Sequence, residues 1–118
     1  MALYQLIAKC GAQKTETIRE IRKYCSLGIA EIVSRMQAGE PVIAIETDDF
    51  PIELDREEGR RWQHTKVLSA HDALSRLGNG VAILYRPSKG YEPPEVVDLD
   101  VAKNLMESDL IYLRQEHD

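Results

Sequence analysis

The sequence predicts an α+β fold of two layers, with one small sheet packed against helices. Short runs rich in apolar and β-branched residues alternate with segments of helical periodicity, and breaks containing glycine or proline separate them. The 118 residues suffice for a single domain with one core. We expect a β-α-α-β-α-β core over residues 1–86, and an appended loop, helix and strand over 87–118. The predicted strands of the core are 3–8, 42–46 and 81–85, and its predicted helices are 15–25, 29–36 and 56–77.

The first strand and helix follow from local patterns. Residues 3–8 form an apolar run that is too short for a helix of ordinary length, so they predict a strand. Ile18, Ile21 and Cys25 then recur at i, i+3 and i+7, which indicates a helix. Thr15 is a candidate N-cap, because its hydroxyl can accept a hydrogen bond from a free amide of the first turn.

A second helix is expected directly after the Leu27-Gly28 break. Glycine readily takes the left-handed conformation that ends a helix, so Gly28 is expected to end the first one. One apolar stripe of the second helix is predicted to be buried: Ile29, Ile32, Val33 and Met36.

The middle of the chain predicts a strand and a possible hairpin. Pro41 stands at the start of the β-rich run 42–46, where proline is tolerated. The alternation in residues 52–55, Ile-Glu-Leu-Asp, is compatible with a further strand.

The second half of the chain predicts a long helix over residues 56–77, with Trp62 in the core and a glycine-rich stop at 78–80. A strand at 81–85 and a loop at 86–94 follow. Asp98 or Asp100 is expected to cap a short helix, and residues 110–113 are expected to form a last strand.

Charge is arranged in alternating blocks along the chain. Residues 9–35 hold six basic against three acidic residues, and 36–58 hold one against eight. Residues 59–89 hold six against one, and 90–118 hold two against eight. Two acidic blocks would repel phosphate, so a protein partner is expected rather than nucleic acid. The absence of a long apolar run predicts a soluble, cytoplasmic protein with no membrane contact.

Catalytic, cofactor and metal sites are not expected. Cys10 and Cys25 lack metal-ligand spacing and are expected to be reduced structural thiols. His64 and His71 are too far apart on one helix to share a metal, and both are expected at the surface or its boundary. His71-Asp72 lies near two serines, but neighbours on one helix cannot converge on a single point as a catalytic triad requires.

An acidic run in the second charge block is the candidate for a surface that binds a basic partner. It lacks the calcium-loop arrangement of ligands around a glycine. The residues of this alternative acidic surface are Glu46, Asp48, Asp49, Glu53 and Asp55.

Residues 11–22 read Gly-Ala-Gln-Lys-Thr-Glu-Thr-Ile-Arg-Glu-Ile-Arg, and Leu27-Gly28-Ile29 follow. This segment resembles the C-terminal domain of the bacterial large-subunit ribosomal stalk protein. In that family a strand ends in Gly-Ala-Asn-Lys, the next helix reads Val-Ile-Lys-x-Val-Arg, and Gly-Leu-Gly-Leu precedes a second helix. The resemblance implies a β-α-α-β-α-β fold, which the Clp protease adaptor domain shares, and it does not extend to residues 87–118.

In the stalk family, the helical hairpin recruits translational GTPases through a basic, partly apolar surface. Ala30 and Val33 stand where the family usually has lysines, so part of that positive surface is missing here. The family's dimerisation segment and hinge have no counterpart, so a stalk protein in the strict sense is not expected. The residues that match the binding surface are Lys14, Ile18, Arg19 and Arg22, with Leu27 and Gly28 at the turn between the helices.

Three hypotheses of function remain open at this point, of which an enzyme that depends on Asp48, Asp49 and His71 ranks last. The first is a non-catalytic module that binds a translation factor or similar GTPase through the basic helices. The second is a small acidic immunity protein or antitoxin that covers the active site of a basic toxin, such as a nuclease. A simple solvated face is also compatible with the basic helix, because Glu16 and Glu20 lie among its arginines. The sequence leaves the oligomeric state open.

Overall fold

Strand β1 (Leu3–Lys9) lies at the centre of the sheet in the computed structural model, which describes residues 2–87 and 93–116. It pairs with β2 (Ile43–Glu46) on one side and β3 (Gly80–Arg86) on the other. Strand β4 (Glu95–Val97) pairs with the outer side of β3. All pairs are antiparallel, and the order is β2-β1-β3-β4.

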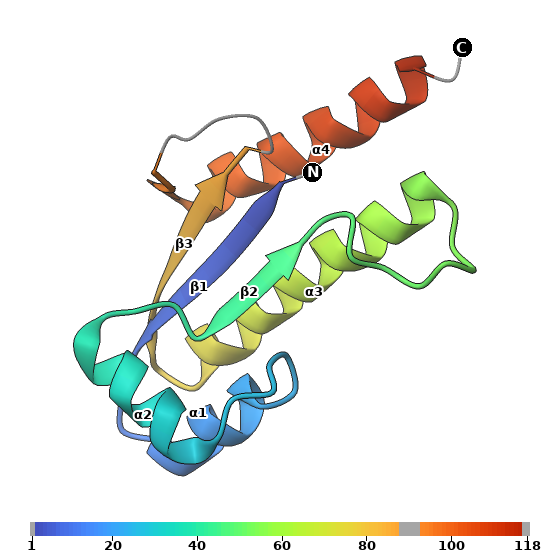
Figure 1. Ribbon diagram of the computed structural model, residues 1–118. Coiled ribbons are helices and arrows are strands. Elements are labelled where there is room, and N and C mark those ends of the chain that lie inside the picture. The colour runs from blue at the N-terminus through green and yellow to red at the C-terminus, as the bar shows by residue number, and fades with distance from the viewer. Residues whose placement is uncertain (1, 88–92, 117–118) are drawn as a thin grey trace.

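Four helices complete the described residues, so the predicted α+β class of two layers is confirmed. They are α1 (Lys14–Ile21), α2 (Ile29–Ala38), α3 (Arg56–Arg76) and α4 (Leu99–Glu116). Helix α3 contacts β1, β2 and β3, and it also contacts α1 and α4. Figure 1 shows α1 and α2 together at one end of the sheet, with α3 running along the strands.

The core lies between one face of the sheet and the helices. Tyr4, Leu6 and Ala8 of β1 are buried, whereas the alternate residues of this strand are half-buried or, at Lys9, exposed. Helix α3 contributes Val67, Ala70 and Leu74, which are fully buried. This alternation is the period of two that a strand produces when one face is covered.

The first helix ends earlier than its periodicity predicts. Helix α1 ends at Ile21, and Cys25 lies half-buried in the turn that follows. Its predicted cap is also wrong, because the helix begins at Lys14 and Gln13 occupies the N-cap position. The chain leaves the helix through tight turns, in which the amide of Tyr24 donates to the carbonyl of Ile21.

Gly28 does not take the expected left-handed conformation. Its φ of −72° and ψ of 163° are extended, and it is the N-cap of α2 rather than the end of α1. The first residue of the predicted buried stripe, Ile29, is 54% exposed. The left-handed glycines in the described residues are Gly39 and Gly78, which follow α2 and α3.

Residues 52–55 form turns instead of a strand. Ile52 is 95% exposed, and the amide of Leu54 donates to the carbonyl of Pro51. The carboxylate of Asp55 accepts a hydrogen bond from the amide of Glu58 at 2.8 Å and so caps α3. The alternation in the sequence therefore came from a helix cap that follows a turn.

Residues 110–113 are helical, so the predicted last strand is wrong. They continue α4, in which Ala102, Met106 and Leu113 are buried along one stripe. The extension is thus strand β4 followed by helix α4. Of the two predicted caps, Asp98 is the one that accepts a hydrogen bond from the amide of Val101. Part of the predicted loop, residues 88–92, lies outside the described residues.

Two residues of α3 lie opposite to their expected positions. Trp62 is 41% exposed, and His64 is 4% exposed. The buried side of this helix is set by Val67 and Leu74, and His64 lies three residues before Val67 on that side. Trp62 is five residues before Val67, which places it on the far side of the helix. His71 is half-buried, as expected for a boundary residue.

Candidate functional site

A hollow of about 550 Å³ lies on the surface of α1 and α2. It is called the basic hollow below, and it is lined by Thr15, Ile18, Arg19, Arg22 and Ile29. Ile18 is 9% exposed, so its side chain belongs mostly to the core. The two arginines are exposed. An apolar surface flanked by guanidinium groups is suited to a partner that is both apolar and acidic.

The position of α1 is fixed by a buried hydrogen-bond network. The amide of Gly11 donates to Asn79 Oδ1 at 2.9 Å, and Asn79 Nδ2 donates to Thr17 Oγ1 at 2.8 Å. Thr17 Oγ1 also lies 2.7 Å from the carbonyl of Gln13, within hydrogen-bond distance. The turn before α1 is thereby joined to the turn between α3 and β3.

Gly11 is required at this junction for a steric reason. A Cβ atom at this position would lie 2.7 Å from the carbonyl oxygen of Gly78, which is part of the backbone. The close approach lets the Gly11 amide reach Asn79. Packing within this chain therefore explains why a glycine stands at the start of the stalk-like motif.

The arginines of the basic hollow are not neutralised by neighbours. Neither Arg19 nor Arg22 forms an ion pair within the residues that the structure describes, and no carboxylate lines the hollow. The nearby Glu20 is paired with Lys23, with Oε2 and Nζ 2.9 Å apart. Of the two acids that could neutralise this face, Glu20 is thus paired with Lys23, and Glu16 forms no ion pair with either arginine among the described residues.

Three of the six predicted binding residues meet in the basic hollow, namely Ile18, Arg19 and Arg22. Lys14 is exposed at the first position of α1, outside the lining of the hollow. Leu27 and Gly28 also lie outside that lining. Ile29 lines it but was predicted to be buried, and its place beside the turn that begins α2 is the signal that could have identified it.

The predicted acidic surface is divided among different roles. Asp48 Oδ1 accepts a hydrogen bond from Arg60 Nε at 2.8 Å, and Asp55 caps α3. Burial alone would raise the pKa of Asp48, but the guanidinium of Arg60 holds it below its usual value. Glu46 is half-buried, while Asp49 and Glu53 are exposed. The five carboxylates therefore differ in exposure and in their contacts within the chain.

A second hollow, of about 600 Å³, lies where the turn before α3 meets the outer side of that helix. We call it the tryptophan hollow. The Lys66 ammonium lies 3.8 Å from the centre of the Trp62 ring and covers part of it. The sequence did not predict this site, because Trp62 was expected in the core. Its lining residues are Pro51, Glu53, Leu54, Glu58, Arg61, Trp62 and Thr65.

A buried polar cluster joins α3 to α4. Arg60, with a side chain that is 8% exposed, donates from Nη1 to Asp109 Oδ1 at 2.9 Å. His64 Nε2 lies 3.7 Å from Asp109 Oδ2, and neither ring nitrogen of His64 has a hydrogen-bond partner within the described part of the chain. Burial lowers the pKa of His64 and raises that of Tyr4, whose ring meets His64 edge-on.

This cluster holds α4 in place, and none of its hydrogen bonds or ion pairs within the described residues involves a serine, threonine or cysteine. Cys10 and Cys25 are free thiols, as predicted. No group of three or more metal-ligating side chains occurs within residues 2–87 and 93–116. Among those residues, no helix has the length and apolar character needed to cross a bilayer.

No family model, curated protein or solved structure matches this chain. The resemblance to the stalk domain therefore depends on the motif at residues 11–29 and on the order of elements.

Proposed function

We propose that this chain is a non-catalytic protein-binding module that engages a translation factor or a similar GTPase through the basic hollow. The observation that carries the proposal is the meeting of Ile18, Arg19 and Arg22 around one hollow. These are positions at which the sequence resembles the GTPase-recruiting surface of the ribosomal stalk. The class of partner comes from that resemblance, and the hollow supplies a surface that fits it.

The chemistry of the hollow favours an acidic helix with an apolar side chain. The apolar side chain would contact Ile18 and Ile29, while carboxylates would meet the arginine pair. Opposite charges at the rim mainly speed association, and the apolar contact supplies most of the affinity. Raising the salt concentration is therefore expected to slow association more than it speeds dissociation.

The test is a calorimetric titration of purified bacterial elongation-factor GTPases with the wild type and with Arg19→Glu/Arg22→Glu. The double variant is expected to weaken binding at least about a hundredfold, because two attractive contacts become repulsive. Arg76→Glu/Lys103→Glu is the matched control, since it changes the net charge equally at exposed positions outside the hollow. Equal binding by wild type and the arginine variant, or no binding by wild type, contradicts the proposal.

The tryptophan hollow favours a second candidate function, that of a small inhibitor of a basic toxin. Ile52 is almost fully exposed beside it, and Glu53 and Glu58 line it. Exposed aromatic and aliphatic side chains next to carboxylates suit a basic protein surface. The test is growth rescue on co-expression with the product of a neighbouring toxin gene, with Trp62→Ala/Glu53→Lys expected to abolish the rescue. Failure of wild type to rescue growth rejects this candidate.

A further inference from the structure

The face of the sheet that points away from the helices is largely apolar. Leu3, Ile7, Ala82 and Leu84 are half-buried, and none of them packs against the buried core. A one-sided antiparallel sheet normally presents polar side chains on its free face. No described helix supplies a cover for these residues, because the core-facing alternates of the same strands take up the helix contacts.

The strand register arranges this free face in rows across the sheet. In the first row, Leu3 lies between Glu46 of β2 and Arg86 of β3. In the second row, Gln5 lies between Ala44 and Leu84, and Val96 of β4 follows next to Leu84. In the third row, Ile7 lies beside Ala82. The row that contains Leu3 therefore carries one acid and one base at equal distances from β1.

A knob and a hollow lie on opposite sides of β1 in the second row. Val96 is 72% exposed and stands two strands from β1 on one side. On the other side, beyond β2, a hollow of about 590 Å³ separates the strand from the turn at residues 23–27. We call it the edge hollow, and its lining includes Gln5, Ala44 and Leu27.

We propose that the free face binds the same face of a second copy of this chain, about a two-fold axis that runs along β1 between the two sheets. This rotation carries each β2 over the β3 of the other copy. Glu46 then faces Arg86 of the second copy, and Val96 enters the second copy's edge hollow. Leu3, Gln5 and Ile7 meet their own equivalents on the axis, where the two Gln5 amides can pair. Lys9, the last residue of β1 on this face, also meets its equivalent, and this like-charge pair opposes the dimer unless the two exposed ammonium groups turn apart into solvent.

Compared with an axis across the strands, an axis along β1 matches the chemistry better. An axis across the strands would stack β2 on β2 and β4 on β4, which leaves Val96 against its own equivalent and Glu46 without a base opposite it. Aligned sheets pack about 10 Å apart with strands about 30° from parallel. A surface with complementary charges and a complementary knob and hollow is self-matching, as an isologous dimer requires.

The size of the face sets the strength of the dimer. Strands of 7, 4, 7 and 3 residues, at about 3.4 Å per residue and about 4.8 Å apart, offer on the order of 340 Å² per copy, which is less than half of a standard interface. We therefore expect a reversible dimer with a dissociation constant of about 10–100 μM. The residues used do not include any that line the basic hollow, so a dimer would present two such hollows.

Sedimentation equilibrium of the full chain over a range of concentrations tests the proposal. Wild type is expected to change from monomer to dimer within that range, and Leu84→Lys is expected to weaken the dimer at least about tenfold, because it places a charge inside the interface. Ile52→Lys is the matched control, since Ile52 is an exposed apolar residue far from this face, and it should dimerise like wild type. A wild type that stays monomeric up to about 1 mM overturns the proposal.

A charge reversal tests the axis without depending on the fold of the leucine variant. Glu46→Arg alone and Arg86→Glu alone are each expected to weaken the dimer about tenfold, because like charges then face each other across the axis. The double variant Glu46→Arg/Arg86→Glu should restore wild-type affinity. Dimerisation that the single variants leave unchanged, or that the double variant does not restore, overturns this arrangement.

Discussion

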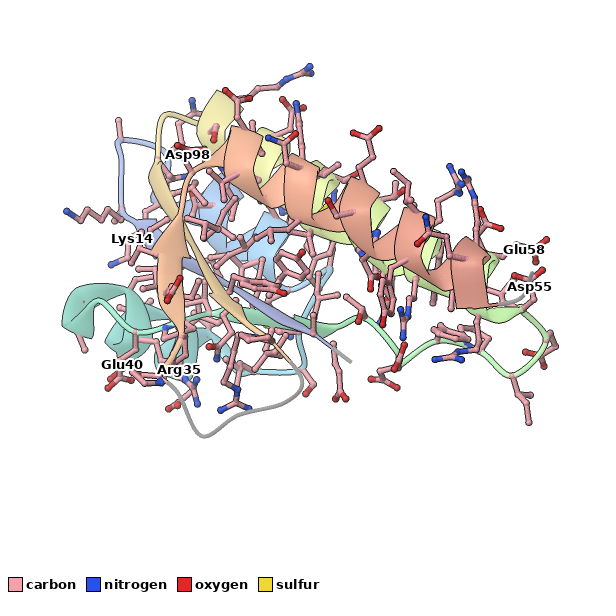
Figure 2. All side chains as sticks on the ribbon, turned by 90° about the horizontal axis from the view of Figure 1, so that it is seen from above. Lys14, Arg35, Glu40, Asp55, Glu58 and Asp98 are labelled. Atoms are coloured by element: carbon pink, nitrogen blue, oxygen red, sulfur yellow. The ribbon has the colours of Figure 1, made fainter. Side chains whose placement is uncertain are left out.

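The two ends of the molecule use their charged residues in opposite ways. At the end formed by α1 and α2, Arg19 and Arg22 have no ion-pair partner within the described residues and remain available to a ligand. At the other end, around residues 47–58, Asp48 pairs with Arg60 and Asp55 caps α3. Figure 2 shows Lys14 and Asp55 at opposite ends of the fold.

Both ends also expose apolar side chains. At the basic hollow Ile18 is drawn into the core but Ile29 is exposed, and at the other end Ile52 and Trp62 stand exposed. The acidic block is strongly charged in sequence, but its structure exposes apolar surface and uses two carboxylates internally. Charge counted along a chain is therefore a poor guide to charge that a partner meets.

The largest expected change in the free energy of unfolding is at the end around residues 47–58, called the acidic end below. Arg60→Met removes the guanidinium that pairs with both Asp48 and Asp109. We expect a loss of about 2–3 kcal/mol in the free energy of unfolding, because two partly buried carboxylates lose their partner. Arg19→Met, at the basic end, should change stability by less than about 0.5 kcal/mol. Urea unfolding of both variants measures the two losses in the free energy of unfolding. Equal losses in Arg60→Met and Arg19→Met would contradict the difference between the two ends.

Two glycines of the stalk-like motif are expected to differ. Packing requires a glycine at position 11, whereas position 28 has room for a side chain. Gly11→Ala forces a Cβ against the carbonyl of Gly78 and should cost about 2 kcal/mol, with loss of the Asn79 hydrogen bond. Gly28→Ser is the control. Gly28 has an extended backbone and open space, and serine is a good N-cap, so this variant should be neutral or more stable by a few tenths of a kcal/mol. A larger loss for Gly28→Ser than for Gly11→Ala contradicts this assignment.

The sequence predicted the order of the first six elements, because each has a clear period and each break has a turn residue. It failed where local patterns have two readings. The alternation at 52–55 fits a strand or a capped turn, and the apolar run at 110–113 fits a strand or the end of a helix. In both cases the answer depends on contacts from distant residues, such as those that bury Leu113.

The candidate site was predictable only in part. The motif at residues 11–22 predicted Ile18, Arg19 and Arg22 as binding residues, and they lie on α1 and its C-cap. Ile29 was missed because its exposure depends on how α2 turns relative to α1. Trp62 was predicted in the core and His64 at the surface, and both predictions were wrong. The cause is that α3 is long and has apolar residues on more than one side. A phase fixed from Val67, Ala70 and Leu74 alone places His64 about 90° and Trp62 about 110° from the centre of the buried side, so it separates the two only weakly.

Acid pH is expected to destabilise the fold through His64, which is buried within α3. Burial lowers the pKa of His64 in the folded chain, so below pH about 6.5 the unfolded chain binds the proton more readily than the folded chain does. Stability should therefore fall as the pH decreases through this range, by at most about 1.4 kcal/mol per pH unit for one group.

The variant His64→Leu should flatten this dependence of stability on pH, although His71, whose pKa is also lowered by burial, retains part of it. An unchanged slope between pH 7 and 5 in His64→Leu contradicts this origin. The lowered pKa of Asp48 acts in a separate window below pH about 4.

The smallest effects are expected from the exposed apolar residues of the acidic end. Trp62→Ala removes a half-exposed ring and its contact with Lys66, and we expect a loss of no more than about 1 kcal/mol. Ile52→Ala should change the free energy of unfolding by less than about 0.5 kcal/mol, since Ile52 is almost fully exposed. Urea denaturation followed by circular dichroism gives both values without using the tryptophan as a probe.

Small losses of stability would mean that the fold does not need these side chains, which leaves them free to contact a partner. A loss of 3 kcal/mol or more in Trp62→Ala would show instead that the ring belongs to the core, and the contrast between the two ends would then lie in charge alone.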